Sequence, residues 1–225
     1  MELKHLAIIM DGNRRWAAEH GKEAYQGHLQ GAKKARDCLA ACLNAGIPYV
    51  SLFAFSKENW SRSQQEVAYL WDIIALQLQE TTSFLMSQEV RFIAIGDKNN
   101  WPAKSRTILE QLINKTQHFT KMTVLLVLDY SGQWDIDQAV VRAAESGNAL
   151  EWKRFLLTSS YPDPDILIRT GCEKRLSNFY LYNLAYTELF FPKVYWPDFT
   201  EEYLKEILSQ YTKRKRRFGV GVIAS

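Results

Sequence analysis

Two patterns of hydrophobic and polar residues alternate along the chain. Short, almost unbroken apolar runs predict strands at residues 6–10, 49–55, 90–95, 123–128 and 166–168. Apolar residues at helical spacing predict helices at residues 31–43, 64–86, 103–116, 134–144 and 201–211. Strands that are apolar along their whole length are typical of parallel sheets with helices over both faces. We therefore predict an α/β fold with a mainly parallel central sheet of about six strands, flanked by helices.

The size of the chain fits one domain. Its 225 residues, 47% of them hydrophobic, are enough to bury one full core, so we predict a single domain over residues 1–225. The longest apolar runs are far shorter than the roughly 20 residues of a membrane-spanning helix. The first residues also lack the pattern of a secretory signal, and we therefore expect a cytoplasmic location.

The positive charge is small but clustered. A formal net charge of +3 is too low to predict binding to nucleic acid. The basic residues gather at Arg14 and Arg15, at Arg169 and Arg175, and at residues 213–217. Local positive sites of this kind predict local anionic ligands. The run at 213–217 also suits the end of a helix, and a peripheral contact with anionic lipid at the inner membrane face is the additional interpretation.

Three cysteines do not suggest a disulfide framework or a zinc site. Cys38, Cys42 and Cys172 are an odd number and form no Cys-x-x-Cys pair with partner histidines. We interpret Cys38 and Cys42 as core residues of a helix.

Polar residues follow each predicted strand. They occupy residues 11–15, 56–60, 96–97, 129–132 and 169–171. In an open parallel sheet, ligands bind beyond the carboxyl ends of the strands, so these groups are expected to converge on one rim. That rim is the predicted functional site.

The first of these segments combines a carboxylate with arginines. Asp11 leaves a buried strand, and Gly12 allows a tight turn before Asn13, Arg14 and Arg15. The carboxylate could hold magnesium while the guanidinium groups bind phosphate oxygens. An Asp helix cap followed by surface arginines is the structural alternative.

A second cationic segment lies after the last predicted strand. Arg169, Thr170, Gly171 and Arg175 supply side-chain and backbone donors of the kind a diphosphate requires. A charged surface turn is the alternative interpretation. Two separate anion sites suggest two phosphorylated ligands.

Three further features allow two interpretations each. His28, where a loop meets a helix, could act in acid–base chemistry or orient phosphate, or could be structural. Glu188 lies in an aromatic stretch, where metal binding or simple exposure would explain a carboxylate. The apolar stripe along residues 64–86 could pack on the sheet or form the wall of a lipid-sized cavity.

Several well-known signatures are missing from the sequence. It contains no Walker A loop, no Gly-x-Gly-x-x-Gly after a strand and no Gly-x-Ser-x-Gly elbow, which argues against nucleotide triphosphatases, dehydrogenases and hydrolases. The Asp-Asp-x-x-Asp cluster of all-helical trans-prenyl synthases is absent as well.

Five sequence blocks, in order, resemble the cis-prenyltransferases, the family of the undecaprenyl diphosphate synthases. The first runs from His5 to Ala17 and contains Asp11 to Trp16, and the second is Gly27-His28 to Gly31. The others span residues 53–62, 168–179 and 185–199. The resemblance covers nearly the whole chain and implies an enzyme that condenses isopentenyl diphosphate with an allylic diphosphate such as farnesyl diphosphate.

The resemblance also implies roles for individual residues. Asp11 would bind Mg²⁺ and promote diphosphate departure, and Glu188 would be a second metal-linked carboxylate. The residues expected around the allylic diphosphate are Gly12, Asn13, Arg14, Arg15 and Trp16. Those expected around isopentenyl diphosphate are Arg169, Arg175 and Ser177. His28 and Ser56 would belong to the phosphate and proton-handling network, and Asn59, Trp60 and Arg62 to a segment that closes over the substrates.

The family resemblance further implies a homodimer with an apolar tunnel in each subunit, between the sheet and the helices. Arg217 and Gly219 in the tail would lie near the partner's site. We predict a long-chain, undecaprenyl-type product that serves as a lipid carrier in cell-wall synthesis. A short-chain or irregular-coupling enzyme and a non-catalytic partner subunit are the alternatives.

Three departures from the family pattern border the predicted site. Ala24 stands where the family usually has an arginine, and Cys172 replaces a glycine. Residues 129–133 read Asp-Tyr-Ser-Gly-Gln in place of Asn-Tyr-Gly-Gly-Arg. The sequence leaves open the product length, the starter and the residues at the tunnel floor, for which Ala54, Leu85 and Leu125 are candidates.

Overall fold

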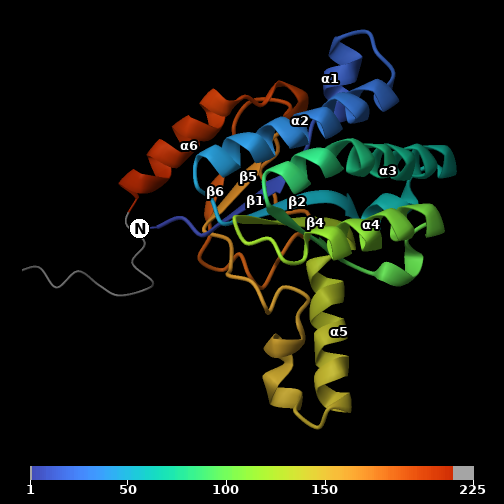
Figure 1. The fold of residues 1–225 in the computed structure, drawn as a ribbon, viewed down its shortest axis with the longest axis vertical. Coiled ribbons are helices and arrows are strands. Elements are labelled where there is room, and N and C mark those ends of the chain that lie inside the picture. The colour runs from blue at the N-terminus through green and yellow to red at the C-terminus, as the bar shows by residue number, and fades with distance from the viewer. Residues whose placement is uncertain (1, 215–225) are drawn as a thin grey trace, which may run out of the picture.

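Six parallel strands form one twisted sheet at the centre of the molecule (Figure 1), seen in a computed structural model that describes residues 2–214. The strands are β1 (His5–Ile9), β2 (Tyr49–Ser56), β3 (Val90–Ile95), β4 (Met122–Tyr130), β5 (Ile166–Arg169) and β6 (Glu188–Phe190). Their order across the sheet is β3-β4-β2-β1-β5-β6, and every pairing is parallel. The predicted α/β class and parallel sheet are confirmed.

The helices account for most of the connections between strands. They are α1 (Asn13–Glu19), α2 (Ala24–Asn44), α3 (Gln64–Ser87), α4 (Ala103–Thr116), α5 (Gly132–Glu145) and α6 (Glu201–Lys213). Short 3₁₀ turns add η1 (Lys57–Ser61), η2 (Lys98–Asn100), η3 (Ala149–Phe155) and η4 (Trp196–Asp198). No helix between residues 2 and 214 combines the length and apolar character needed to cross a membrane.

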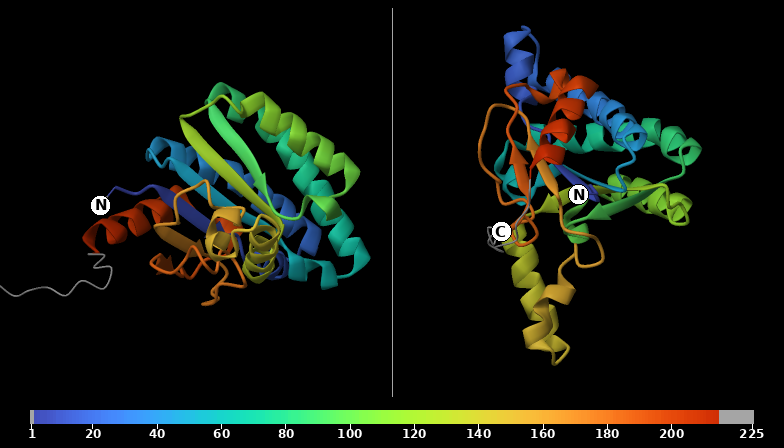
Figure 2. Two further views of the ribbon diagram at one scale, coloured as in Figure 1. Left: turned by 90° about the horizontal axis from the view of Figure 1, so that it is seen from below. Right: turned by 90° about the vertical axis from the view of Figure 1, so that its left-hand side faces the viewer.

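The two faces of the sheet are covered differently (Figure 2). Leu6 and Ile8 of β1 face a large core shared with α2, α3, α4 and α6. Ala7 and Ile9 face a smaller core that contains Phe179 and Tyr180 from the segment after β5, together with the start of α5. Helices therefore cover mainly one face, whereas irregular chain covers much of the other. The rest of α5 projects from the body of the molecule alongside η3 (Figure 1).

Most predicted elements occupy the expected positions. Residues 90–95 and 103–116 match β3 and α4 in full, and Cys38 and Cys42 are buried on α2 as expected. The short helix α1 and strand β6 were not predicted as elements, and α2 begins seven residues before the predicted start. A capping box between Glu23 and Gln26 begins α2 in a region whose apolar pattern is weak.

Candidate functional site

A polar cleft of about 880 Å³ opens at the carboxyl ends of β1, β2 and β5. This volume lies in the range of about 300–1,000 Å³ typical of ligand sites. The polar residues that line it are Asp11, Asn13, Arg14, Arg15, His28, Ser56, Glu58, Asn59, Arg62, Arg169, Arg175, Ser177 and Asn178. The strand-end segments 11–15, 56–62 and 169–178 thus line one cleft, as the parallel sheet predicted, whereas the predicted segments 96–97 and 129–132 do not line it.

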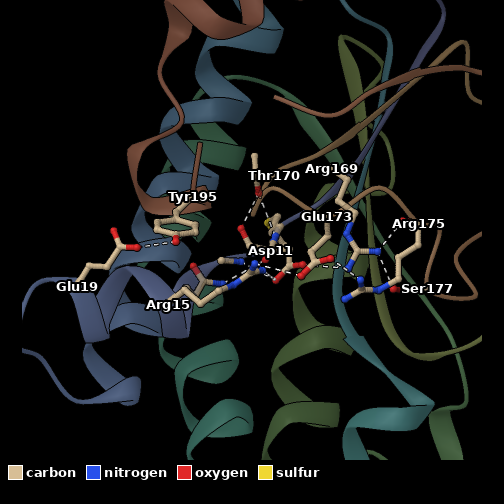
Figure 3. Close-up of polar contacts among 12 residues, drawn as sticks. Asp11, Arg15, Glu19, Arg169, Thr170, Glu173, Arg175, Ser177 and Tyr195 are labelled. Carbon is tan, nitrogen blue, oxygen red and sulfur yellow. Dashed lines mark hydrogen bonds and ion pairs between the residues drawn. The ribbon is translucent and has the colours of Figure 1, made fainter. Parts of the chain in front are cut away.

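Asp11 is the central carboxylate of this cleft (Figure 3). Its Oδ2 accepts a hydrogen bond from Arg169 Nη2 at 2.9 Å, and its Oδ1 accepts one from Arg15 Nη2 at 3.1 Å. Its backbone is fixed by the Thr170 hydroxyl, which accepts from the Asp11 N–H and donates to the Asp11 carbonyl oxygen. The side chain of Asp11 is 28% exposed, so it faces the cleft while still engaging both arginines.

Glu173 links two of the cleft arginines. Its Oε1 accepts from Arg15 Nη1 at 3.2 Å, and its Oε2 accepts from Arg175 Nη1. The arginine side chains are about half exposed here, in contrast to that of Arg169, which is 4% exposed. Arg169 Nη1 donates to the Ser177 hydroxyl and to the Arg175 carbonyl oxygen. Carboxylates of the protein therefore form ion pairs with the same guanidinium groups that could bind phosphate oxygens.

Gly171 permits the close approach of these segments. It has a φ of +84°, and a Cβ there would lie 2.8 Å from Arg15 Nη2 and 2.9 Å from the backbone of Asp11. Any larger residue would therefore displace the two side chains on which the cleft depends. The next residue, Cys172, also has a positive φ, of 61°, and its thiol is exposed.

The segment after β2 forms another wall of the cleft. Ser56 and Asn59 form a capping box in which the Asn59 side chain accepts from the Ser56 N–H at 3.0 Å. Glu58 accepts a hydrogen bond from Asn178 Nδ2 at 2.9 Å, which joins this segment to the one after β5. Arg62 and Arg14 both contact Glu66 on α3. A second pair of cleft arginines is thus held by one internal carboxylate.

His28 lies where the cleft narrows toward the core. Burial lowers the pKa of His28 to about 4, with smaller contributions from Arg62 and Arg14 that Glu66 opposes. Its Nε2 is buried and has no hydrogen-bond partner among the described residues. The imidazole is therefore neutral at pH 7 and leaves one ring nitrogen free to interact with a ligand.

An apolar cavity of about 140 Å³ adjoins the cleft, between the sheet and α2 and α3. Six residues line both spaces: Met10, Asn13, His28, Phe53, Ala54 and Leu70. The stripe predicted on residues 64–86 therefore lines this cavity as well as packing on the sheet, with Leu78 and Leu85 farther in. Of the three candidates for the tunnel floor, Ala54 and Leu85 line this cavity, whereas Leu125 lies on the opposite face of the sheet.

Three predicted site residues lie outside the cleft lining. The indole of Trp16 is buried and donates to Asp198 at 2.8 Å, and that of Trp60 donates to Asp129 at 2.8 Å. Glu188 pairs with Arg214 at the start of β6. That position is at the opposite end of β5 from Arg169, about 10 Å away along the strand. Within one chain, Glu188 therefore does not lie beside Asp11. Arg217 and Gly219 lie outside the described residues.

Three carboxylates of the site were not anticipated. Glu58, Glu66 and Glu173 contact the cleft arginines or Asn178. Glu66 could have been found from its spacing, since it lies four residues after Arg62 on the first turn of a helix. The contacts of Glu58 and Glu173 join segments far apart in the sequence, which residue spacing does not reveal.

The arrangement joins a cationic, polar cleft directly to an apolar cavity. Such a site can hold an anionic head group against arginines while it keeps an attached hydrocarbon chain away from water. Among residues 2–214, no three or more His, Cys, Asp or Glu side chains are grouped so that they could hold a metal ion by themselves.

Comparisons with known proteins show the family of the chain. The family model described as "Putative undecaprenyl diphosphate synthase" matches residues 9–219. An isoprenyl transferase from Porphyromonas gingivalis is 39% identical over 96% of this chain and 89% of its own, and one from Aquifex aeolicus is 41% identical over 96% and 95%.

Solved structures also match the chain along nearly its whole length. Lavandulyl diphosphate synthase from Lavandula x intermedia, in complex with dimethylallyl diphosphate, has a TM-score of 0.92 and 32% identity, covering 96% of this chain and 98% of its own. A probable undecaprenyl diphosphate synthase from Campylobacter jejuni has a TM-score of 0.83 and 32% identity, with coverage of 97% and 99%.

Proposed function

The chain belongs to the undecaprenyl diphosphate synthase family of prenyltransferases, and from this premise we propose that it elongates an allylic diphosphate with isopentenyl diphosphate in the cis configuration. The observation that carries the proposal is the shared lining of the polar cleft and the apolar cavity. A prenyl diphosphate has the same two parts, an anionic head and an apolar chain.

The arginines of the cleft are the proposed diphosphate ligands. Arg15 and Arg175 share Glu173, and their half-exposed side chains can exchange this contact for phosphate oxygens. Arg169, with Ser177, is held more rigidly and would orient the second diphosphate. Gly12, Asn13 and Arg14 complete the allylic end of the cleft in this proposal.

The proposed reaction breaks the bond between the allylic carbon and a diphosphate oxygen, forms a carbon–carbon bond to the isopentenyl double bond, and releases a proton. Fixed donors around the departing diphosphate stabilise the charge that develops there. Ser56 and Asn59 are the proposed polar contacts on the side of η1, and neutral His28 adds no positive charge beside the nascent cation. The apolar cavity keeps water away from that cation.

Mg²⁺ fits the oxygen donors of this site. The cleft offers the half-buried Asp11 carboxylate, and magnesium is commonly held by one or two carboxylates together with substrate phosphates and water. When bound, the ion would supply positive charge that favours departure of the diphosphate. Glu188 could add a ligand only from a second subunit, because its own chain holds it at the other end of β5.

A homodimer, a cytoplasmic location and a peripheral contact with anionic membrane are further parts of the proposal. Lys213 is the last residue of α6, and Arg214 follows it in the sequence. Light scattering would measure the dimer. Sedimentation with vesicles that contain or lack anionic lipid would test the membrane contact, and equal binding to both kinds would contradict an electrostatic attraction.

The size of the apolar cavity favours a short-chain product as a second candidate function. A cavity of about 150 Å³ holds one benzene molecule, so about 140 Å³ has room for about one five-carbon unit. An undecaprenyl-type product for cell-wall lipid synthesis, which we propose first, requires α2 and α3 to separate around the chain. The similarity to lavandulyl diphosphate synthase agrees with the second candidate.

One assay tests both candidates. The purified chain is incubated with Mg²⁺, isopentenyl diphosphate and, in separate reactions, dimethylallyl, geranyl or farnesyl diphosphate, and the extracted lipids are sized. A ladder of long products from farnesyl diphosphate supports the undecaprenyl-type synthase, whereas one or two additions support the short-chain enzyme. Absence of any elongated product with all three starters contradicts the enzymatic proposal.

A further inference from the structure

Behind the 56–62 segment lies a charged cluster that does not line the cleft. Lys57 Nζ lies 3.0 Å from Asp97 Oδ2 and 3.5 Å from Asp129 Oδ1. It also lies 4.5 Å from the centre of the Trp134 ring. Lys57 and Asp97 come just after β2 and β3, and Asp129 lies near the end of β4, so the lysine links the ends of three strands.

Asp129 is the most buried member of the cluster, with none of its side chain exposed. Its Oδ1 accepts from Trp60 Nε1 at 2.8 Å, and its Oδ2 accepts from Asn100 Nδ2 at 3.0 Å. The left-handed backbone at Asp129, with a φ of 48°, lies next to the irregular pairing between β2 and β4. A buried carboxylate requires such partners, because its desolvation would otherwise be costly.

The 56–62 segment therefore has two distinct sides. Ser56, Asn59 and Arg62 line the cleft, whereas Lys57 and Trp60 reach Asp129 on the other side. All five belong to one short 3₁₀ turn and its two flanking residues. The orientation of this turn thus determines how the cleft-lining side chains face a ligand.

We infer that Asp129 and Lys57 are positioning residues whose ion pair holds Asn59 and Arg62 over the cleft. The inference rests on the proposed prenyl transfer for its kinetic consequence, but its structural consequence is independent of any activity. Trp60 packs against Phe55 and Trp71, so the indole adds an apolar contact to the polar one. Weakening the ion pair should favour opening of the turn without changing the groups that contact substrate.

Limited proteolysis measures this opening directly, because trypsin cleaves after Lys57 and Arg62. The informative variant is Asp129→Asn, which keeps the shape and an acceptor for Trp60 but removes the charge of Asp129 and leaves Asp97 as the remaining carboxylate of the cluster beside Lys57. Asparagine is also the residue of the family pattern at this position, so the variant is expected to fold. We expect cleavage after Arg62 to accelerate about tenfold, since cleavage follows the population of the open form.

Kinetics supply the second measurement. Both Asp129→Asn and Lys57→Met are expected to raise KM for isopentenyl or allylic diphosphate about tenfold, with a smaller change in kcat. The double variant should be no worse than Lys57→Met alone, because that variant already lacks the ion pair with Asp129. If the parent chain shows no prenyl transfer, the proposed function fails while the proteolysis still decides the inference.

Asp135→Asn is the matched control. Asp135 is also fully buried, but it accepts hydrogen bonds from Tyr130 and from the Leu157 N–H, away from the 56–62 segment. A purely structural role for Asp129 would make the two variants alike, with lower stability and general proteolysis but no selective cleavage or rise in KM. That result, or unchanged cleavage and KM in Asp129→Asn and Lys57→Met, would overturn the inference.

Discussion

The guanidinium of Arg169 donates to the carboxylate of Asp11 over 2.9 Å, and this pair joins the two sequence segments that are 158 residues apart. Arg169 is almost fully buried, whereas Asp11 reaches the cleft. The proposed metal ligand is therefore also the counterion of a buried cation. Its substitution is expected to affect stability as well as activity.

Replacing Asp11 separates these two roles. Asp11→Asn keeps acceptor oxygen but loses the charge, and we expect turnover to fall by about 10²-fold or more because charge stabilisation at the departing diphosphate is lost. Asp11→Ala should do the same and also lower the free energy of unfolding by about 1–2 kcal/mol, since the buried guanidinium of Arg169 loses its partner. Turnover assays and urea denaturation measure the two effects. Unchanged turnover in both variants would remove Asp11 from the proposed chemistry.

Mixing two inactive variants tests the role of Glu188 in a dimer. If Glu188 completes the Asp11 site of a partner subunit, Asp11→Ala and Glu188→Gln mixed subunits contain one site with both carboxylates. We expect the mixture, after co-refolding, to recover activity that neither variant shows alone. Glu173→Gln combined with Asp11→Ala is the control, because both carboxylates contact Arg15 of the same chain. A fully active Glu188→Gln variant would contradict a metal-binding role.

Stability should depend on pH through His5. This residue is 2% exposed and is hydrogen-bonded to Ser51 and to the Pro162 carbonyl oxygen, and burial lowers the pKa of His5 to about 4, against weaker opposing effects of Asp165 and Asp163. The unfolded chain therefore binds a proton near pH 6.5, which the folded chain does not bind until about pH 4. The contribution of His5 to stability is fully present above pH 6.5 and is lost as the pH falls from about 6.5 to about 4.

The expected loss from His5 between pH 7 and pH 5 is about 2 kcal/mol, and His28, whose pKa burial also lowers to about 4, adds a loss of the same sign that the His5 variant retains. Urea denaturation at the two pH values measures it. The His5→Gln variant should be less stable at pH 7 but should lack this part of the pH dependence. An equal loss in the parent and the variant would show that other groups cause it.

Ala54 provides a test of product length. It lies where the cleft meets the apolar cavity, so Ala54→Leu adds three carbon atoms to the space that the growing chain must pass. We expect a shorter product and a slower final addition, measured by sizing the extracted lipids. Ala40→Leu on α2 is the control because Ala40 lines neither space. If the parent and Ala54→Leu gave the same product, the growing prenyl chain would not pass Ala54 on its way into the cavity.

Cys172 offers a stabilising substitution. Its φ of 61° places a residue with a Cβ in the left-handed region, which costs about 1–2 kcal/mol. Glycine removes this strain but loses about 0.5–1 kcal/mol in chain entropy. Because the thiol is exposed, we expect Cys172→Gly to raise the free energy of unfolding by about 0.5–1 kcal/mol. A decrease, measured by urea denaturation, would mean that the thiol makes a favourable contact.

The sequence predicted the fold well because each strand carries its own signal. A strand in the middle of a parallel sheet is buried on both faces, so its sequence is an almost unbroken apolar run such as residues 123–128. Such a run can be recognised without knowing the rest of the fold. β6 was missed because only three residues, Glu188–Phe190, pair there and two of them are only partly buried or exposed. Its pairing depends on β5, which lies elsewhere in the sequence.

The site was predicted only in part for a related reason. Strand-end positions gave Asp11, Arg169 and Arg175 directly, since all parallel strands end at one edge. The contact of Glu173 with Arg15 and the burial of Trp16 against Asp198 depend on how loops fold back over the sheet. Family resemblance suggested Glu188 as a metal ligand, and its distance from Asp11 within one chain followed only from the strand register.

The six residues common to the cleft and the cavity have a consequence for the order of events in catalysis. A prenyl intermediate whose tail lies beyond Phe53 and Leu70 cannot leave for bulk water until its tail has been withdrawn past these residues. Successive additions should therefore occur processively, with each intermediate retained between turnovers. The product distribution would then reflect the competition between the next addition and escape, so that slower release yields longer chains.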